Sequence, residues 1–361
     1  MTVALVGGTE GLSLTAGMAA RAAPAPLWEF VRASGLAPLV ICDSKNPNAK
    51  FAIVLVSRAT GRATLAIKAP TSDAAAQAVE AESRMLLHLR DLDETLASTI
   101  PRFHETVELD GRPALVMSAV EGTSMRTSYL RWRHTARRSS VEADFAAVET
   151  WLAAFQRATV TGVASLAPDG AASCRIAKRY AGRAGLDDVL ERYDEICGRL
   201  SPYTTPQTAV HGDLWTNNLL LRDGRVSGVV DWEDGQRAGK PARDVARFAL
   251  MYALFLDRRT RLGRRVPGHR VLRAGAWGAA VEYAIDGHGW FPDLFRRFLR
   301  RNLVRLGAPA GAWRDTALAG VAEVAALADD DAFARLHLEL FGRLASPHSP
   351  ERRGVACARP P

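Results

Sequence analysis

The architecture of this chain can be predicted from the sequence His211-Gly-Asp-Leu-Trp-Thr-Asn-Asn-Leu-Leu-Leu221, followed by Asp223-Gly224 and by Val229-Val-Asp-Trp232. Residues 219–221 and 226–230 are short apolar runs on either side of the Asp-Gly pair. An Asp-Gly dipeptide between two such runs is the strongest local signal for a β-hairpin. We therefore predict two short antiparallel strands, which bring the residues before the first strand next to those after the second.

Three oxygen-bearing side chains lie at the ends of this hairpin. Asp213 precedes the first strand, Asn218 begins it and Asp231 ends the second strand. Hard oxygen ligands of this kind suit Mg²⁺, which takes one or two protein ligands together with waters and substrate phosphates. A His-x-Asp sequence followed five residues later by Asn is the catalytic-loop signature of kinases. We therefore predict Asp213 as the base that accepts the proton of a substrate hydroxyl, and Asn218 and Asp231 as Mg²⁺ ligands.

The departures from the protein-kinase pattern point to small-molecule kinases. Gly212 stands where protein kinases have Arg, and Trp-Glu follows Asp231 where they have Phe-Gly. With the segment Pro241-Ala-Arg-Asp-Val-Ala246, these motifs resemble the aminoglycoside phosphotransferase and choline kinase-like family. The resemblance covers residues from about 39 to 250. It implies an α+β, two-lobed protein-kinase-like fold, with a small β-rich N-terminal lobe and a larger helical C-terminal lobe.

An upstream hairpin predicts the residue that binds the nucleotide phosphates. Residues 51–56 and 63–67 are β-prone runs joined by a polar hexapeptide. The second run ends in Leu65-Ala-Ile-Lys68, close to the Val-Ala-Ile-Lys strand whose lysine pairs with nucleotide phosphates in kinases. Lys68 is therefore the predicted phosphate-binding lysine.

A helix predicted over residues 74–89 supplies the partner of that lysine. Glu82 falls within its apolar face, whereas Glu80 lies on its polar face. A buried carboxylate needs a partner, because an unpaired buried charge costs several kcal/mol or is neutralised. We predict an ion pair between Glu82 and Lys68, as kinases require.

Two further segments are assigned from the resemblance. A strand over residues 39–42 leads into a loop that has no glycine where kinases have a glycine-rich flap. The family often builds this loop from small polar residues, which implies that Ser44 and Asn48 contact phosphate oxygens; a turn without ligand contact is the alternative. The strand that runs into Gly122 resembles the hinge of the family, which implies that the backbone of Ser118 and Val120 binds the adenine edge.

The resemblance implies a phosphotransferase that uses ATP, or GTP, and Mg²⁺ to phosphorylate a hydroxyl of a small molecule. A sugar, a nucleoside, an antibiotic or an amino alcohol could be the acceptor, and an aminoglycoside-resistance kinase is the alternative within this class. A protein kinase fits less well, because only a short segment separates Asp231 from Asp244. A binding protein without catalysis would have little reason to keep all the predicted site residues. His211 is expected to brace the catalytic loop, and Asp244 to anchor that loop or a helix start.

The expected domains follow from length and composition. The chain has 361 residues, of which 48% are hydrophobic, so two lobes can each bury a core. We predict a nucleotide-binding lobe over residues 1–121 with a loose Ala- and Gly-rich start at 1–26, a helical catalytic and substrate lobe over 122–345, and a flexible tail over 346–361. In the second lobe, a capping box of Ser139 and Glu142 is expected to open a helix. Further helices are predicted over residues 244–256, 273–285, 292–303 and 317–344.

Composition also bounds the partners. No apolar run approaches the roughly 18 to 20 residues that span a bilayer, so no membrane partner is expected. The four cysteines are scattered without metal-type or redox-type spacing, which favours a cytoplasmic location. Nucleic-acid binding is suggested only by net charge and has no recognisable module, so no nucleic-acid partner is expected. The sequence leaves the oligomeric state open.

The charge distribution gives one indication of the acceptor. Lys and Arg number 47 against 39 Asp and Glu, a formal net charge of +8. Arginine runs occur at Arg126, Arg131, Arg133, Arg137 and Arg138, and at Arg258, Arg259, Arg261, Arg264 and Arg265. They are either solvated faces or part of a site for an anionic or nucleotide-bearing substrate. An acidic group occurs at Glu323, Asp329, Asp330, Asp331 and Glu339. We expect a neutral or mixed-charge acceptor to be preferred over a polycation.

Overall fold

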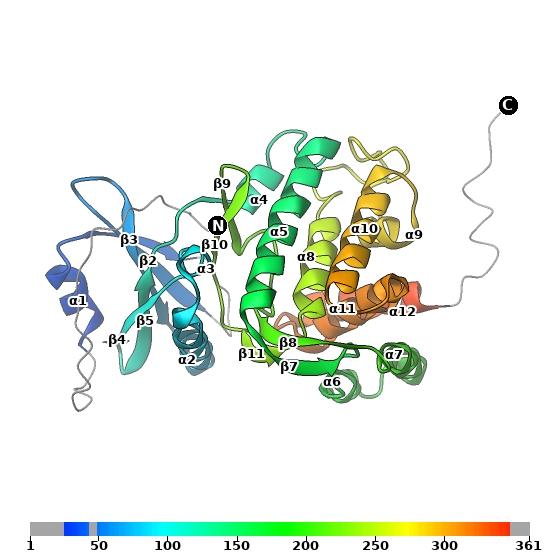
Figure 1. Cartoon of the computed structure of the whole chain (residues 1–361), viewed down its shortest axis with the longest axis horizontal. Coiled ribbons are helices and arrows are strands. Elements are labelled where there is room, and N and C mark those ends of the chain that lie inside the picture. The colour runs from blue at the N-terminus through cyan, green and yellow to red at the C-terminus, as the bar shows by residue number, and fades with distance from the viewer. Residues whose placement is uncertain (1–24, 43–48, 347–361) are drawn as a thin grey trace.

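The N-terminal lobe is built on a five-stranded antiparallel sheet (Figure 1). The computed structural model describes residues 25–42 and 49–346. The sheet has the strand order β1-β2-β3-β5-β4. The elements of this lobe are α1 (Leu27–Ala33), β1 (Ala37–Cys42), β2 (Lys50–Val56), β3 (Ala63–Pro70), α2 (Asp73–His88), η1 (Leu89–Asp91), α3 (Glu94–Ala97), β4 (Phe103–Leu109) and β5 (Arg112–Ser118).

Strand alternation places the predicted lysine. Leu65 and Ile67 of β3 point into the small core that α1 covers. Because successive side chains of a strand point to opposite faces, Lys68 lies on the other face, where α2 packs on the sheet. The hairpin and the helix predicted for this region are both confirmed.

The C-terminal lobe is mainly helical, and its helices α5, α8 and α10 run side by side (Figure 1). Two small sheets, in the orders β10-β9-β6 and β11-β8-β7, lie beside these helices. The elements of this lobe are β6 (Thr123–Ser124), α4 (Met125–Tyr129), α5 (Arg138–Ala158), β7 (Val160–Ser165), α6 (Ala171–Arg179), α7 (Leu186–Leu200), β8 (Thr204–Val210), β9 (Leu219–Arg222), β10 (Arg225–Val229), β11 (Gln236–Gly239), α8 (Ala242–Leu254), α9 (Ala279–Asp286), α10 (Trp290–Arg305), η2 (Ala310–Ala312), α11 (Trp313–Leu327) and α12 (Asp331–Ala345).

The hairpin that carries the kinase motif forms as predicted. Strands β9 and β10 pair antiparallel around Asp223 and Gly224. Both turn residues have positive φ, 53° and 73°. A two-residue turn of the type that suits the twist of a hairpin requires positive φ at both positions, which is why Asp-Gly is favoured here.

Three helix boundaries differ from the predictions. Helix α5 begins at Arg138 without a side-chain cap, so the predicted capping box is wrong, and Glu142 accepts a hydrogen bond from Arg138 at 2.9 Å instead. The helix predicted from residue 273 begins only at Ala279, after Gly278 with φ of +86°. The single helix predicted over 317–344 is two helices, because the side chain of Asp330 caps a new start at α12.

Trp232 lies at the centre of the larger core. Its ring is fully buried and contacts the rings of Phe155 and His211, with centroid distances of 5.5 and 4.6 Å. Trp232 thereby fixes the chain directly after Asp231.

Among the described residues, no helix combines the length and apolar character needed to cross a membrane. The division of the chain at residues 121 and 122 stays a prediction.

Candidate active site

Asp244 and His211 fix the predicted catalytic loop, residues 211–218. The buried carboxylate of Asp244 accepts the backbone N–H of His211 at 2.7 Å and that of Gly212 at 2.9 Å. Burial raises the pKa of Asp244. The His211 ring donates through Nε2 to the Val230 carbonyl oxygen at 2.9 Å, and its Nδ1 accepts the Asp213 N–H at 3.2 Å. Both residues therefore have the bracing roles predicted from the sequence.

Gly212 lets this loop lie close to the segment that follows Asp231. Its φ is +84°, in the left-handed region that favours glycine. A Cβ atom at this position would lie 2.3 Å from the carbonyl oxygen of Asp234. The larger Arg of protein kinases therefore cannot occupy this position without moving the backbone.

The carboxylate of Asp213 uses its two oxygens differently. Arg247 of α8 donates to Oδ1 through Nε at 2.9 Å and through Nη2 at 2.5 Å. Asn218 donates through Nδ2 to the Asp213 carbonyl at 2.9 Å and, in a longer hydrogen bond of 3.3 Å, to Oδ2. Oδ2 is therefore the oxygen better able to accept a hydrogen bond from a substrate.

Arg247 was not predicted from the sequence, although a signal for it exists. It follows Asp244 by three residues on α8. Residues three apart lie on the same face of a helix, so the face that anchors the catalytic loop also presents Arg247 to it.

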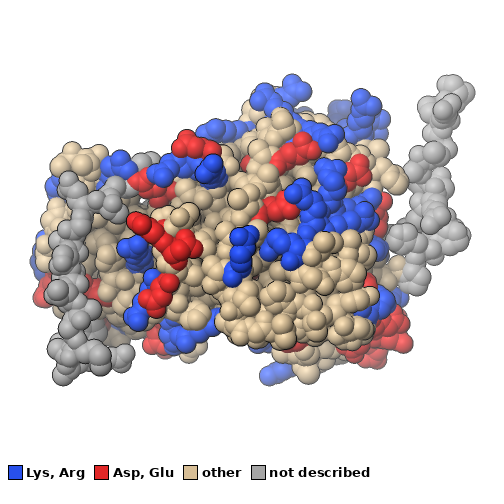
Figure 2. Space-filling model, viewed as in Figure 1, with Lys and Arg blue, Asp and Glu red and all other residues tan. Residues whose placement is uncertain are grey.

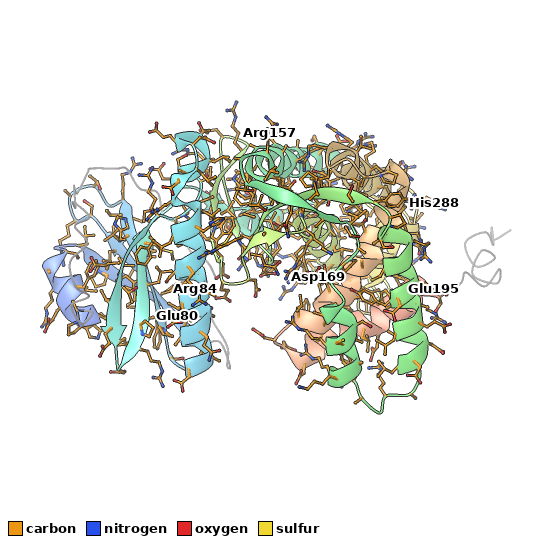
Figure 3. All side chains as sticks on the ribbon, turned by 60° about the horizontal axis from the view of Figure 1, so that its bottom comes forward. Glu80, Arg84, Arg157, Asp169, Glu195 and His288 are labelled. Carbon is orange, nitrogen blue, oxygen red and sulfur yellow. The ribbon has the colours of Figure 1, made fainter. Side chains whose placement is uncertain are left out.

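Lys68 joins the two lobes of the site. Its Nζ lies 2.6 Å from Glu82 and 2.5 Å from Asp231. Glu82 is completely buried and also accepts the backbone N–H of Trp232 at 3.2 Å. Burial alone would lower the pKa of Lys68, but the charges of Asp231 and Glu82 outweigh burial and raise it. The predicted ion pair is thus present, while Glu80 pairs with Arg84 on the exposed side of α2, at 3.4 Å (Figure 3).

A cluster of three carboxylates surrounds Asp231. One carboxylate oxygen from each of Glu82, Asp231 and Glu233 lies within 4.8 Å of the others. Burial would raise the pKa of Asp231, yet the charges of Lys68 and Lys50 lower it to about 2. Burial and the charge of Asp231 raise the pKa of Glu233 to about 7, and Glu233 pairs with Lys50. Sequence reasoning did not identify Glu233 or Lys50.

The donor set near Asp231 fits a hard divalent cation. Asp231 offers a carboxylate, and Asn218 has an amide oxygen to offer because its nitrogen is used by Asp213. These are the oxygen donors that Mg²⁺ prefers. The assignment of Asn218 and Asp231 as metal ligands stays a prediction.

The predicted hinge, residues 118–120, offers a backbone donor. The Ser118 N–H donates to the Arg102 carbonyl at 2.9 Å, so a nucleotide contact of the Ser118 backbone would come from its carbonyl. The Val120 N–H has no acceptor within the described part of the chain. Ser44 and Asn48 lie outside the described residues, and their contact with phosphate stays a prediction.

A cavity of about 240 Å³ opens beside Asp213. Its wall mixes acids, two arginines and apolar side chains of α11 and α12, and is formed by Gly212, Asp213, Glu233, Asp234, Arg243, Arg247, Gly320, Glu323, Val324, Leu327, Ala328, Asp329, Asp330 and Phe333. Burial raises the pKa of Glu323 in this wall. Asp331 and Glu339 lie outside it and pair with Arg179 and Arg183 at 2.5 and 3.2 Å.

Comparisons with known proteins agree with this geometry. The model of the phosphotransferase enzyme family, APH, matches residues 47–277. A thermostable mutant of aminoglycoside phosphotransferase APH(4)-Ia in its apo form is 14% identical, with a TM-score of 0.51 over 91% of this chain and 99% of that chain. A ternary complex of such a mutant with ADP and hygromycin B is 16% identical, with a TM-score of 0.52 over 89% and 99%. Macrolide 2'-phosphotransferase type I is 15% identical, with a TM-score of 0.49 over 89% and 96%.

Among curated proteins, no sequence matches this chain. At 14% and 16% identity, the likeness to the APH(4)-Ia structures concerns the fold, and it confirms the predicted two-lobed kinase-like architecture. The family match spans well over half of the chain, from before Lys68 to beyond Asp244, and confirms the predicted enzyme class. The chain belongs to the phosphotransferase enzyme family.

Proposed function

We propose that this enzyme transfers the γ-phosphoryl group of ATP, in a Mg²⁺-dependent reaction, to a hydroxyl of a small molecule bound in the acidic cavity. The observation that supports this most directly is the position of Asp213, whose carboxylate lines the cavity while its loop also carries Asn218. The Ser118 carbonyl and the Val120 N–H would bind the adenine edge. GTP is the alternative donor, because backbone groups would make these contacts.

Asp213 is placed to accept the proton of the acceptor hydroxyl. Because Arg247 occupies Oδ1 with two donors, the proton would go to Oδ2. As the hydroxyl oxygen bonds to the γ-phosphorus, the bond from that phosphorus to the β,γ-bridging oxygen breaks and ADP leaves. A positioned base of this kind contributes about 10²- to 10⁴-fold to the rate.

The remaining site residues would hold the nucleotide. Lys68, fixed by Glu82, would bind the α and β phosphates. Mg²⁺, when bound by Asn218 and Asp231, supplies positive charge that neutralises the phosphates. Lys68 and Asp231 form an ion pair at 2.5 Å, in which their charges neutralise each other. Nucleotide binding would therefore exchange that contact for contacts with phosphate and metal.

The cavity favours a small acceptor of mixed charge. Its volume of about 240 Å³ is below the about 300–1,000 Å³ typical of drug-sized ligand sites, so it suits a single ring. Arg243 and Arg247 line it together with the acids Glu323, Asp329 and Asp330. An acceptor with one amine and one anionic or strongly polar group would match both kinds of charged residue. The acids also keep an aminoglycoside-type kinase as the second candidate.

A nucleotide-consumption screen tests the proposal. Purified protein is given ATP or GTP, with and without Mg²⁺, and a panel of sugars, nucleosides, amino alcohols, macrolides and aminoglycosides. We expect acceptor-dependent release of nucleoside diphosphate and a phosphorylated product detected by mass spectrometry. Tight nucleotide binding without consumption on any hydroxylated compound would contradict the proposed activity.

A further inference from the structure

Two segments distant in sequence form one basic face at the edge of the helical lobe. Residues 130–137 connect α4 to α5, and residues 258–273 belong to the long connection from α8 to α9. The His269 ring bonds to the Thr135 carbonyl at 2.9 Å, and Arg259 donates to the Leu130 carbonyl. We call these two segments together the arginine-rich face. Figure 2 shows Lys and Arg side chains gathered along the upper edge of the helical lobe, where Figure 1 places these connections.

The arginine-rich face carries ten arginines and no acid. Three lie in residues 130–137 and seven in residues 258–273, while neither segment contains Asp or Glu. Within the described part of the chain, none of the ten forms an ion pair with a carboxylate. Like charges gathered without counter-charge repel one another, so this face is suited to a partner with many negative charges.

Three strongly exposed apolar side chains lie on the same face, each next to at least one arginine in the sequence. Trp132 is 87% exposed and stands between Arg131 and Arg133. Leu262, 80% exposed, follows Arg261, and Val271, 61% exposed, follows Arg270. A single exposed apolar side chain needs no explanation, but three within one acid-free basic face form a pattern.

The combination of arginines with exposed apolar side chains favours an anionic membrane over nucleic acid as the partner of this face. Nucleic acid would be read by arginines and by aromatic rings that stack on bases, and it offers no partner for exposed Leu262 and Val271. A bilayer with anionic lipids offers both phosphates for the guanidinium groups and an apolar layer for the side chains between them. Trp is enriched at this interface, where its ring lies at the level of the headgroups.

We propose that the arginine-rich face docks on a membrane surface rich in anionic lipids, with Trp132, Leu262 and Val271 inserted among the headgroups. This association is peripheral and reversible. It differs from the expectation of no membrane partner, which was based on the lack of a long apolar run. The face adjoins the catalytic loop, since Arg126 and Arg258 both lie over the Phe255 ring, at 5.5 and 5.3 Å, and Arg126 also lies over Trp215. Docking would therefore place the active site near the membrane surface.

Co-sedimentation with vesicles tests this proposal without any acceptor or turnover. The full chain is mixed with phosphatidylcholine vesicles that contain phosphatidylglycerol, and with vesicles of phosphatidylcholine alone. The double variant Arg131→Gln and Arg133→Gln should reduce partitioning onto the anionic vesicles about 25-fold, since each arginine near an anionic surface contributes about fivefold. Trp132→Ser and Leu262→Ser should also reduce it, because they remove inserted apolar surface.

Matched control variants distinguish the effect of the arginine-rich face on vesicle binding from the effect of net charge. Arg157→Gln with Arg225→Gln removes two exposed charges elsewhere, and Val163→Ser removes an apolar side chain that is 78% exposed on β7 (Arg157 is labelled in Figure 3). These variants should bind the anionic vesicles as the parent chain does. The proposal would be overturned if the control variants lost as much vesicle binding as the variants of the arginine-rich face, or if the parent chain bound both kinds of vesicle equally or bound neither. A preference of the parent chain for single-stranded RNA over the anionic vesicles would also overturn it.

Discussion

At the scale of single residues, the unequal use of the two Asp213 oxygens determines what substitutions should do. Oδ1 accepts two hydrogen bonds from Arg247, whereas Oδ2 accepts only one longer hydrogen bond, from Asn218 at 3.3 Å. The prediction of Asp213 as the base rests on a local motif, with His211, Asp213 and Asn218 in one stretch of eight residues. Arg247 comes from another element, so only the packing of α8 on the loop reveals it.

The substitution Asp213→Asn should lower turnover by about 10²- to 10⁴-fold and leave nucleotide binding unchanged, because the amide keeps the shape but accepts no proton. Steady-state kinetics and a nucleotide titration check this. Asp169→Asn is the control, since Asp169 is an exposed acid that pairs with Lys240 at 2.8 Å (Figure 3). Near-normal turnover of Asp213→Asn would show that another group is the base.

The substitution Arg247→Lys should lower turnover about tenfold or more with little change in the KM for ATP. A lysine carries one ammonium group and cannot donate two bonds in one plane, so the carboxylate loses its fixed orientation. Arg237→Lys on exposed β11 is the control. Unchanged turnover of Arg247→Lys would mean that the orientation of Asp213 is set by its backbone alone.

Substitutions of the two predicted metal ligands should differ in severity. Asp231→Ala should weaken the Mg²⁺ dependence of nucleotide binding more than Asn218→Ala, because a carboxylate neutralises charge and an amide only coordinates. Titrations of nucleotide with and without Mg²⁺ measure this. If both variants bound nucleotide equally and still responded to Mg²⁺, neither residue would be a ligand.

At the scale of elements, what the sequence predicts depends on how local the cause is. The β9–β10 hairpin is set by its own Asp-Gly turn, and α2 by its own apolar stripe, so both were predicted. The break between α11 and α12 depends on Asp330 capping a new helix, which the continuous helical pattern around it concealed. The start of α5 at Arg138 has no side-chain cap, so a capping motif in the sequence could not locate it.

The contact between His269, in the α8–α9 connection, and Thr135, in the α4–α5 connection, should make the stability of the protein depend on pH. His269 donates through Nε2 to Thr135, while its buried Nδ1 has no partner among the described residues. Burial lowers the pKa of His269 to about 4, from 6.5. Between these values the unfolded chain binds a proton that the folded chain does not, so stability falls as the pH falls through this window. At pH 5 this amounts to about 2 kcal/mol.

The variant His269→Gln, which keeps a donor for Thr135, should lose less stability between pH 7 and pH 5 than the parent chain, as measured by urea denaturation. Glu233 has the opposite effect on stability in this pH range, because burial and the charge of Asp231 raise its pKa to about 7. Its effect is the same in the parent chain and in His269→Gln, so it cancels when the two pH profiles are compared. His288→Gln, at an exposed position (Figure 3), is the control. Parallel pH profiles for the parent and His269→Gln would refute the assignment.

At the scale of the whole molecule, net charge and local charge point in opposite directions. The chain has a formal net charge of +8, yet the cavity beside Asp213 is lined by more acids than arginines. Charges interact across solvent only over about 10 Å at 0.1 M salt, so the local groups dominate capture of a small acceptor. The sequence showed both the acidic group and the arginine runs, but only the fold separates acids of the cavity, such as Glu323, from acids outside it, such as Glu339.

The last prediction concerns this local charge. Glu323 lies in the cavity wall and receives no hydrogen bond from the described residues, so it is available to an amine of the acceptor. For an acceptor that carries both an amine and an anionic group, Glu323→Gln should raise KM about tenfold, while the KM of a neutral sugar stays unchanged. Glu339→Gln, which disturbs the pair with Arg183, should leave both values unchanged.

A tetra-amino aminoglycoside should be a poor acceptor, because Arg243 and Arg247 lie in the same cavity. Efficient phosphorylation of that compound, abolished in Glu323→Gln, would instead identify the enzyme as an aminoglycoside-type kinase.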